Sequence, residues 1–145
     1  MISSQQPQST DSHSSSLLSK TILVIDDDEM IREAMIGLLR SLGYTSLAVA
    51  TTEESIPILT SQPIAAVLVD HLPVGQDGFA AAKELRQQAE KYDPEAQLQI
   101  IGMTGSMAIE DKKAYDLDGH LIKPFSADQL REVLEKKNPA TRDKP

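Results

Sequence analysis

Short apolar runs alternate with helical patterns between about residues 20 and 137 of this chain, and this alternation constrains the fold most. Runs of this length suit buried strands, and each is bounded by turn residues or polar residues. The five runs are Ile22–Ile25, Leu47–Ala50, Ala65–Val69, Leu98–Met103 and His120–Ile122. Because strands that alternate with helices form parallel sheets with right-handed crossovers, the pattern predicts an α/β domain.

The first two helical patterns each contain a distinctive residue. After the first strand one helical face is apolar, and Gly43 follows it as a helix stop. That face consists of Ile31, Ala34, Met35, Leu38, Leu39 and Leu42. The next helix starts near Thr52 and contains Pro57, so we expect it to be short, late-starting or kinked.

Three further helices are predicted in the second half of the chain. One spans about Phe79–Tyr92, after a loop with Pro73, Gly75 and Gly78, and a short one lies around Ala108–Tyr115. The last opens with a capping box from Ser126 to Gln129. Its buried residues are predicted to be Leu130, Val133 and Leu134.

Composition narrows the setting and the class of function. A net charge of −8 argues against direct binding to nucleic acid or to anionic membranes. The chain has no cysteine, no apolar stretch long enough to span a bilayer, and no secretory signal pattern at its start. We therefore expect a cytoplasmic domain at residues 20–137, between a flexible Ser/Gln-rich tail at 1–19 and a flexible tail at 138–145.

Reactive side chains follow the predicted strands. Asp26–Asp28 follow the first strand, and Asp70 ends the third. Thr104 ends the fourth strand, and Lys123 follows the fifth. Because ligands bind at the carboxyl ends of parallel strands, we expect these groups to meet at one edge. Each Asp alone is explained as a turn or helix-cap residue, but that explanation does not account for the whole set.

Carboxylates gathered in this way need a counter-charge. Two of them about 4 Å apart repel by about 1 kcal/mol in water and by about 4 kcal/mol at an effective dielectric near 20. One lysine cannot offset three acids, so the cluster takes up protons or binds a hard cation, for which Mg²⁺ (or Mn²⁺) is best suited. A phosphoryl group could then contact the metal, Lys123 and Thr104, with a carboxylate as nucleophile. Asp70 is the natural acceptor because it ends the central strand.

The chain resembles the receiver domain of two-component response regulators over about residues 20–137. The resemblance rests on ILVIDDDEMIR at 22–32, VLVD at 67–70 with DG at 77–78, IIGMTG at 100–105 and HLIKPF at 120–125. It implies a flavodoxin-like, doubly wound (βα)5 fold with strand order 2-1-3-4-5.

The resemblance also implies site roles, residue by residue. Asp70 is implied as the phospho-acceptor, and Thr104 and Lys123 as the residues that contact the phosphoryl group. Metal ligation is implied for Asp26 (through water), Asp27, Asp70 and the backbone carbonyl of Leu72. The Lys123–Pro124 peptide bond is implied to be cis.

Three departures from the family pattern are visible. The loop DHLPVGQDG after Asp70 has its proline one place early, and the stretch from Thr104 to Lys123 is short, in the region of the fourth helix. His120 stands at the aromatic switch position. It is either a half-buried residue without a special role or a rotamer switch coupled to Thr104. In the second case, the ordinary histidine pKa near 6.5 would add pH sensitivity.

The favoured function is a phosphorylation-dependent signalling switch that is not an ordinary enzyme. Its phosphoryl donor would be a histidine kinase or a histidine phosphotransfer protein, and its output face would comprise the fourth helix, fifth strand and fifth helix. One alternative is a haloacid-dehalogenase-like phosphatase with Asp26 as nucleophile. Another is a degenerate receiver that binds partners constitutively.

Overall fold

The computed structural model describes residues 20–71, 81–95, 97–105 and 117–136. Its elements are β1 (Thr21–Ile25), α2 (Glu29–Ser41), β2 (Thr45–Val49), α3 (Thr52–Leu59), β3 (Ala66–Asp70), α4 (Ala82–Tyr92), β4 (Gln99–Thr104), β5 (Gly119–Ile122) and α5 (Ala127–Glu135). Several predictions concern segments outside the described residues. They are the tails at 1–19 and 138–145, the loop with Leu72, Pro73, Gly75 and Gly78, the helix start at Phe79, and the helix at Ala108–Tyr115.

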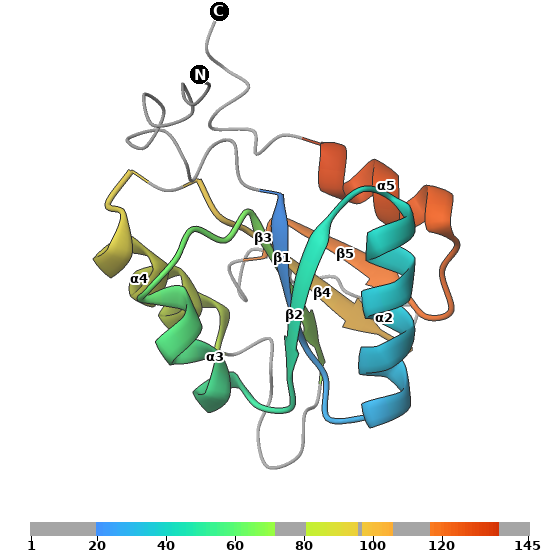
Figure 1. Ribbon diagram of the computed structural model, residues 1–145, viewed down its shortest axis with the longest axis horizontal. Helices are drawn as coiled ribbons and strands as arrows, with labels where there is room; N and C mark the ends of the chain where they lie inside the picture. The colour runs from blue at the N-terminus through green and yellow to red at the C-terminus, as the bar shows by residue number, and fades with distance from the viewer. Residues whose placement is uncertain (1–19, 72–80, 96, 106–116, 137–145) are drawn as a thin grey trace, which may run out of the picture.

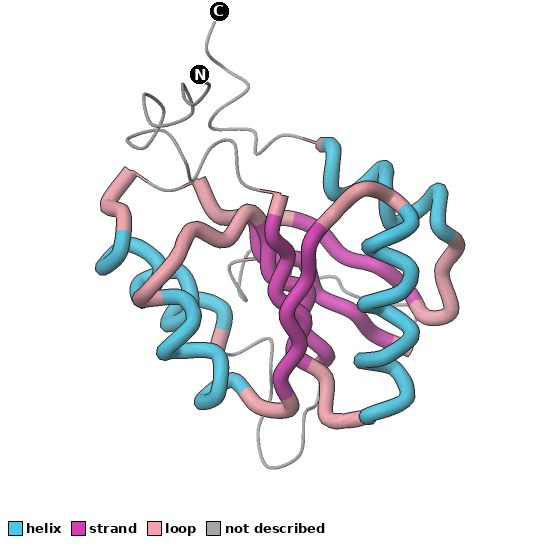
Figure 2. The backbone as a smooth tube through the Cα atoms, viewed as in Figure 1, coloured by secondary structure: helices cyan, strands magenta, loops and turns pink. Residues whose placement is uncertain are grey.

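The described strands form one five-stranded parallel sheet in the order β2-β1-β3-β4-β5, which confirms the predicted fold class. Helices α2 and α5 cover one face of the sheet, and α3 and α4 cover the other (Figure 1). The tube in Figure 2 shows the strands enclosed between these two helical layers. In the centre of the sheet, Ile25 of β1 pairs with Val49 on one side and with Val69 on the other. The carboxyl ends of β1 and β3 are therefore neighbours.

Most strand boundaries differ from the sequence prediction by one or two residues. β2 begins at Thr45 rather than Leu47, because Thr45 and Ser46 continue the backbone pairing with β1 although they are not apolar. β4 begins at Gln99 rather than Leu98 and ends at Thr104, as predicted, where Thr104 pairs with Ile122 of β5. Backbone pairing decides these boundaries, whereas the apolar runs mark only the buried part of each strand.

The core has one aliphatic layer on each face of the sheet. Side chains alternate along β1, so that Leu23 and Ile25 pack toward α3 and α4, while Ile22 and Val24 pack toward α2 and α5. The helices complete these layers with Leu59, Ala82, Leu85 and Ala89 on the first face and Met35, Leu39 and Leu130 on the second. A sheet covered on both faces explains why the strands are almost continuously apolar.

Helix α2 is capped by Asp28, whose carboxylate accepts hydrogen bonds from the N–H groups of Met30 and Ile31 at 2.9 and 3.4 Å. Met35 and Leu39 of the predicted apolar face are buried. Ala34 is exposed, contrary to the prediction, because it lies at the margin of that face. Gly43 follows the helix with φ of 95°, as expected for a helix stop.

The other helices follow their local signals. Helix α3 begins at Thr52, as predicted, and has eight residues with Pro57 inside it, so of the three alternatives expected from the proline the structure shows a short helix. The capping box of Ser126 and Gln129 in α5 is present, and Leu130 is buried. Val133 and Leu134 are only half-buried, because they lie at the edge of the core layer. No helix in the described part of the chain is long and apolar enough to cross a membrane.

An ion pair that the sequence did not predict closes the opposite edge of the sheet. Arg86 of α4 donates to the Asp118 carboxylate at 3.0 Å and to the Leu98 carbonyl at 2.9 Å. The same Asp118 oxygen accepts from the Ile100 N–H at 2.8 Å. These contacts join α4 to the beginnings of β4 and β5.

Two glycines, one inside α2 and one just after it, are expected to respond oppositely to alanine. Gly43→Ala should lower the free energy of unfolding by about 1 kcal/mol, because an L-residue is strained at its positive φ. Gly37→Ala should raise it by about 0.5–1 kcal/mol, because Gly37 lies inside α2 with open space around it. Urea unfolding followed by circular dichroism measures both changes, and changes of the same sign would contradict this account.

Candidate functional site

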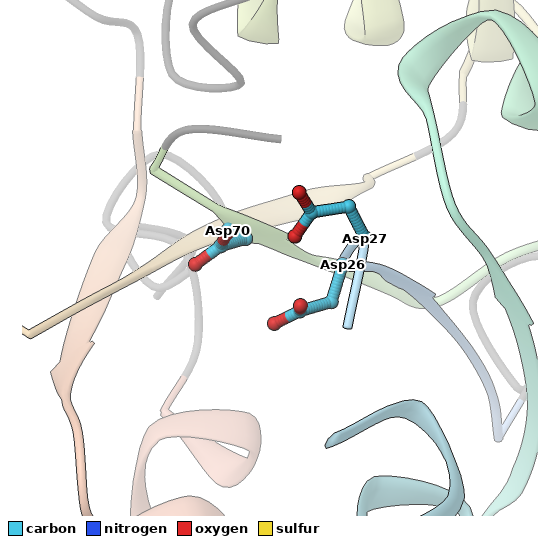
Figure 3. A group of neighbouring side chains, drawn as sticks. All are labelled: Asp26, Asp27 and Asp70. Carbon is cyan, nitrogen blue, oxygen red and sulfur yellow. The ribbon is translucent and has the colours of Figure 1, made fainter. Parts of the chain in front are cut away.

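Three carboxylates meet at the carboxyl edge of the sheet. Asp26 and Asp27 follow the last residue of β1, and Asp70 is the last residue of β3. One oxygen of each lies within 4.8 Å of the others. Figure 3 shows Asp26 and Asp27 reaching from the end of β1 and Asp70 from the adjacent strand. The topology therefore brings together the acids that the sequence places at two strand ends.

Lys123 joins two of these acids. Its Nζ donates to Asp70 Oδ1 at 2.8 Å and to Asp26 Oδ2 at 3.1 Å. The Asp26 side chain is only 1% exposed, so this ammonium group is its counter-charge in a place that water does not reach. The Lys123 backbone N–H donates to the Thr104 carbonyl at 2.6 Å, which attaches the lysine to the end of β4.

The pKa of Lys123 lies above its ordinary value. Burial by itself lowers the pKa, but the hydrogen bonds to Asp70 and Asp26 and the charges of both carboxylates outweigh burial and raise it. The ammonium form is therefore the one present at neutral pH. Lys123 stabilises the site as a cation and does not act as a base.

Asp26 uses all of its polar groups. Its N–H donates to the Val49 carbonyl at 3.1 Å, and its Oδ1 accepts from the Asp28 N–H at 2.9 Å. Its Oδ2 accepts from Lys123, and its backbone carbonyl accepts from Nη1 of Arg32 at 2.8 Å. Arg32 is the last residue of the first sequence motif, but nothing in the motif assigned it to the site. A side chain that reaches six residues back to a carbonyl leaves no periodic signal.

The other predicted site residues have different placements. Thr104 is buried at the end of β4, beside β3 in the sheet. Asp28 caps α2 and is not part of the carboxylate group. His120 lies half-buried on β5, and the Lys123–Pro124 peptide bond is cis, as the resemblance implies. Leu72 falls outside the described residues.

The donor set of the site fits a hard divalent cation. Three carboxylates supply only oxygen ligands, and their charge exceeds that of the single ammonium group beside them. Asp27 and Asp70 are half-buried, which leaves the site open on one side for water or an anion. Such a cation would be held by Asp27 and Asp70, with Asp26 behind them.

The chain matches the family model of the response regulator receiver domain over residues 22–135. It therefore belongs to the receiver domain family of two-component response regulators. Members of this family are signalling switches that histidine kinases phosphorylate. The comparison does not favour the haloacid-dehalogenase-like alternative.

Three known proteins illustrate the relationship. The phosphate regulon transcriptional regulatory protein PhoB of Pseudomonas aeruginosa is 28% identical over 137 residues, which cover 89% of this chain but 58% of PhoB. The receiver domain of the sensor histidine kinase PA1611 of Pseudomonas aeruginosa, crystallised with a magnesium ion in its active site cleft, is 26% identical with a TM-score of 0.68. That alignment covers 81% of this chain and 95% of the receiver domain.

The third protein is the response regulator TrrA of Thermotoga maritima, solved in complex with Mg²⁺-BeF. It is 27% identical with a TM-score of 0.68, over 80% of this chain and 96% of TrrA. This chain therefore matches receiver structures over nearly their full length, whereas it spans little more than half of PhoB.

Removal of the lysine cation should destabilise the domain. Lys123→Met is expected to lower the free energy of unfolding by about 3 kcal/mol at pH 7, because Asp26 loses the counter-charge of its buried carboxylate. The raised pKa of Lys123 means that its stabilisation is present below the unfolded-state pKa and is lost as pH rises through the folded-state pKa. The difference between wild type and variant should hold from pH 7 to about 9 and shrink only above about 10.4, the ordinary lysine value.

Denaturant unfolding at several pH values checks this prediction. Lys83→Met, on the exposed face of α4, is the matched control and should change stability by less than about 0.5 kcal/mol. Equal losses in the two variants would show that Lys123 contributes no more than a surface lysine.

Proposed function

We propose that this chain is a phosphorylation-dependent switch whose acceptor is Asp70, and that its donor is a phosphohistidine on a histidine kinase or a phosphotransfer protein. One observation carries the proposal. Asp70 Oδ1 is held by Lys123 at 2.8 Å, while Oδ2 has no hydrogen-bond donor among the described residues. One oxygen is thus oriented and the other is available to react.

In the proposed transfer, an Asp70 oxygen attacks phosphorus and forms the new P–O bond. The P–N bond to the donor imidazole breaks, and its electron pair returns to the ring nitrogen, which takes up a proton. No oxidant or other co-reactant is needed. The products are an aspartyl phosphate on this chain and a neutral histidine on the donor.

Lys123 and Thr104 are proposed to receive the phosphoryl oxygens. The ammonium group of Lys123 already contacts Asp70, so it would neutralise charge that arrives at this carboxylate. The Thr104 hydroxyl comes from the neighbouring strand end and would donate to another oxygen. A bound Mg²⁺ (or Mn²⁺) would supply the remaining charge neutralisation, held by Asp27 and Asp70, with Asp26 acting through water and Leu72 through its carbonyl.

The geometry supports Asp70 over Asp26 as the nucleophile. Both Asp26 carboxylate oxygens accept hydrogen bonds, and its side chain is 1% exposed, against 15% for Asp70. An incoming phosphoryl group would have to displace Lys123 or the Asp28 N–H before it reached Asp26. The Asp26-centred phosphatase alternative is therefore disfavoured on chemical grounds as well.

The wider setting is also part of the proposal. We place the receiver domain at residues 20–137 of the sequence and in the cytoplasm, where kinases meet such domains. Its only chemistry would be its own phosphorylation and dephosphorylation, so it would not be an enzyme with a separate substrate. The net charge of −8 favours a protein partner over direct binding to nucleic acid.

Intact-mass analysis tests the acceptor. Incubation with acetyl phosphate and Mg²⁺ should add one phosphoryl mass to the wild-type chain, and Asp70→Asn should abolish the gain because the amide is no nucleophile. Asp26→Asn, the matched control, should slow the gain without abolishing it. Chelation of the metal with EDTA should prevent it.

Two outcomes would contradict this assignment. If the wild-type chain gains no mass, the constitutive binding module is favoured. If Asp70→Asn retains the gain while Asp26→Asn loses it, Asp26 is the nucleophile.

The output is proposed to pass through His120 to the face formed by β5 and α5. A pocket of about 330 Å³ lies on this face, lined by His120 and Ile122 of β5 and by Gln129, Glu132 and Val133 of α5. Movement of Thr104 toward the phosphoryl group would disturb β5, because the Thr104 carbonyl is bonded to the Lys123 N–H. Phosphorylation would then shift this face toward a second conformation that partners distinguish from the first.

NMR of the histidine rings tests this route. The ring signals of His120 should shift when the wild-type chain is phosphorylated. Thr104→Ala, which removes the hydroxyl, should still accept the phosphoryl group but leave the His120 signals close to their unphosphorylated positions. An unchanged His120 spectrum in the phosphorylated wild type would exclude His120 from the output route.

A further inference from the structure

We infer that Arg32 is a positioning residue that fixes the orientation of the Asp27 carboxylate. The inference rests on the proposed function, because it deepens the account of how this site holds a divalent cation. Within the described residues, Arg32 donates no hydrogen bond to any of the three carboxylates. It acts through the backbone, by its 2.8 Å hydrogen bond to the Asp26 carbonyl.

The three acids of the site are held in different ways. Asp26 is fixed through both carboxylate oxygens, and Asp70 is fixed through Oδ1 by Lys123. The Asp27 carboxylate has no hydrogen-bond donor within the described residues. Among these residues, the hydrogen bonds that bear on its position are those of the backbone that carries it.

Hydrogen bonds hold both peptide units that flank Asp27. The unit before it contains the Asp26 carbonyl, which accepts from Arg32. The unit after it contains the Asp28 N–H, which donates to Asp26 Oδ1 at 2.9 Å. Because peptide units are planar, holding both of them fixes φ and ψ of Asp27 and hence the direction in which its side chain leaves the backbone.

Arg32 is well placed to act as an anchor. It lies in the first turn of α2, where its N–H donates to the Asp28 carbonyl at 3.0 Å. The start of this helix is itself fixed by the Asp28 cap on Met30 and Ile31. The guanidinium group thus connects the capped start of α2 to the backbone between Asp26 and Asp27.

The consequence concerns metal affinity. Residues that orient metal ligands typically contribute 10- to 100-fold in affinity, and Arg32 acts one step further from the metal. Arg32→Met should therefore weaken Mg²⁺ binding about tenfold, whereas Arg32→Lys, which keeps a donor and the charge, should stay within about threefold of wild type. Arg32→Met should therefore be phosphorylated more slowly than wild type at low Mg²⁺, and its rate should approach that of wild type when Mg²⁺ is saturating.

Isothermal titration calorimetry measures the Mg²⁺ affinities. Thermal melting without metal measures the stability of each variant separately. Arg40→Met, an exposed arginine on the same helix, is the matched control and should bind Mg²⁺ like wild type. A purely structural role predicts a lower melting temperature with unchanged Mg²⁺ affinity, and that result would overturn the inference.

Two further results keep the test decisive. If Arg32→Met does not fold, Arg32→Ala takes its place, because it also removes the donor and favours the helix, and wild-type affinity in Arg32→Ala would overturn the inference. If the wild-type chain itself neither binds Mg²⁺ nor gains a phosphoryl group, the proposed function fails and Arg32 has no metal ligand to position. The two failures are thus distinguishable.

Discussion

The confinement of three carboxylates beside one ammonium group is the constraint on which the site depends. The central strands β1 and β3 end side by side, so Asp26, Asp27 and Asp70 cannot avoid each other once the sheet forms. Lys123 relieves the repulsion for two of the acids and leaves net negative charge at the edge of the sheet. That residual charge makes the site receptive to a divalent cation and, with the cation, to an anionic phosphoryl group.

Three chemically identical side chains acquire different roles from their surroundings. Asp26 is buried and fully hydrogen-bonded, so it orders the site from within. Asp70 is partly exposed, and only one of its carboxylate oxygens accepts a hydrogen bond from a described residue, which suits a nucleophile. Asp27 has its direction set by the backbone, which suits a ligand that must be ready before the metal arrives. Identity of residue type therefore says little about role here, and the pattern of hydrogen bonds says much.

Sequence reasoning predicted the fold and most of the site because both depend on periodic or terminal signals. The apolar runs located the strands, and the rule that ligands bind at carboxyl ends located Asp70 and Lys123. It missed what depends on long side chains that contact backbone, such as Arg32 on the Asp26 carbonyl and Arg86 on the Leu98 carbonyl. It also placed the start of β2 too late, because strand pairing extends past the apolar residues that periodicity detects.

The lysine contacts of the site span very long stretches of the chain. Lys123 meets Asp26 across 97 residues and Asp70 across 53. Folding therefore has to close these loops and order β1, β3 and β5 together before the acceptor has its cation, and parallel sheets with such distant pairings are slow to form. A nascent or partly folded chain carries all the reactive side chains but no assembled centre. Assembly of the site is thus coupled to complete folding, so a partly folded chain does not yet have it.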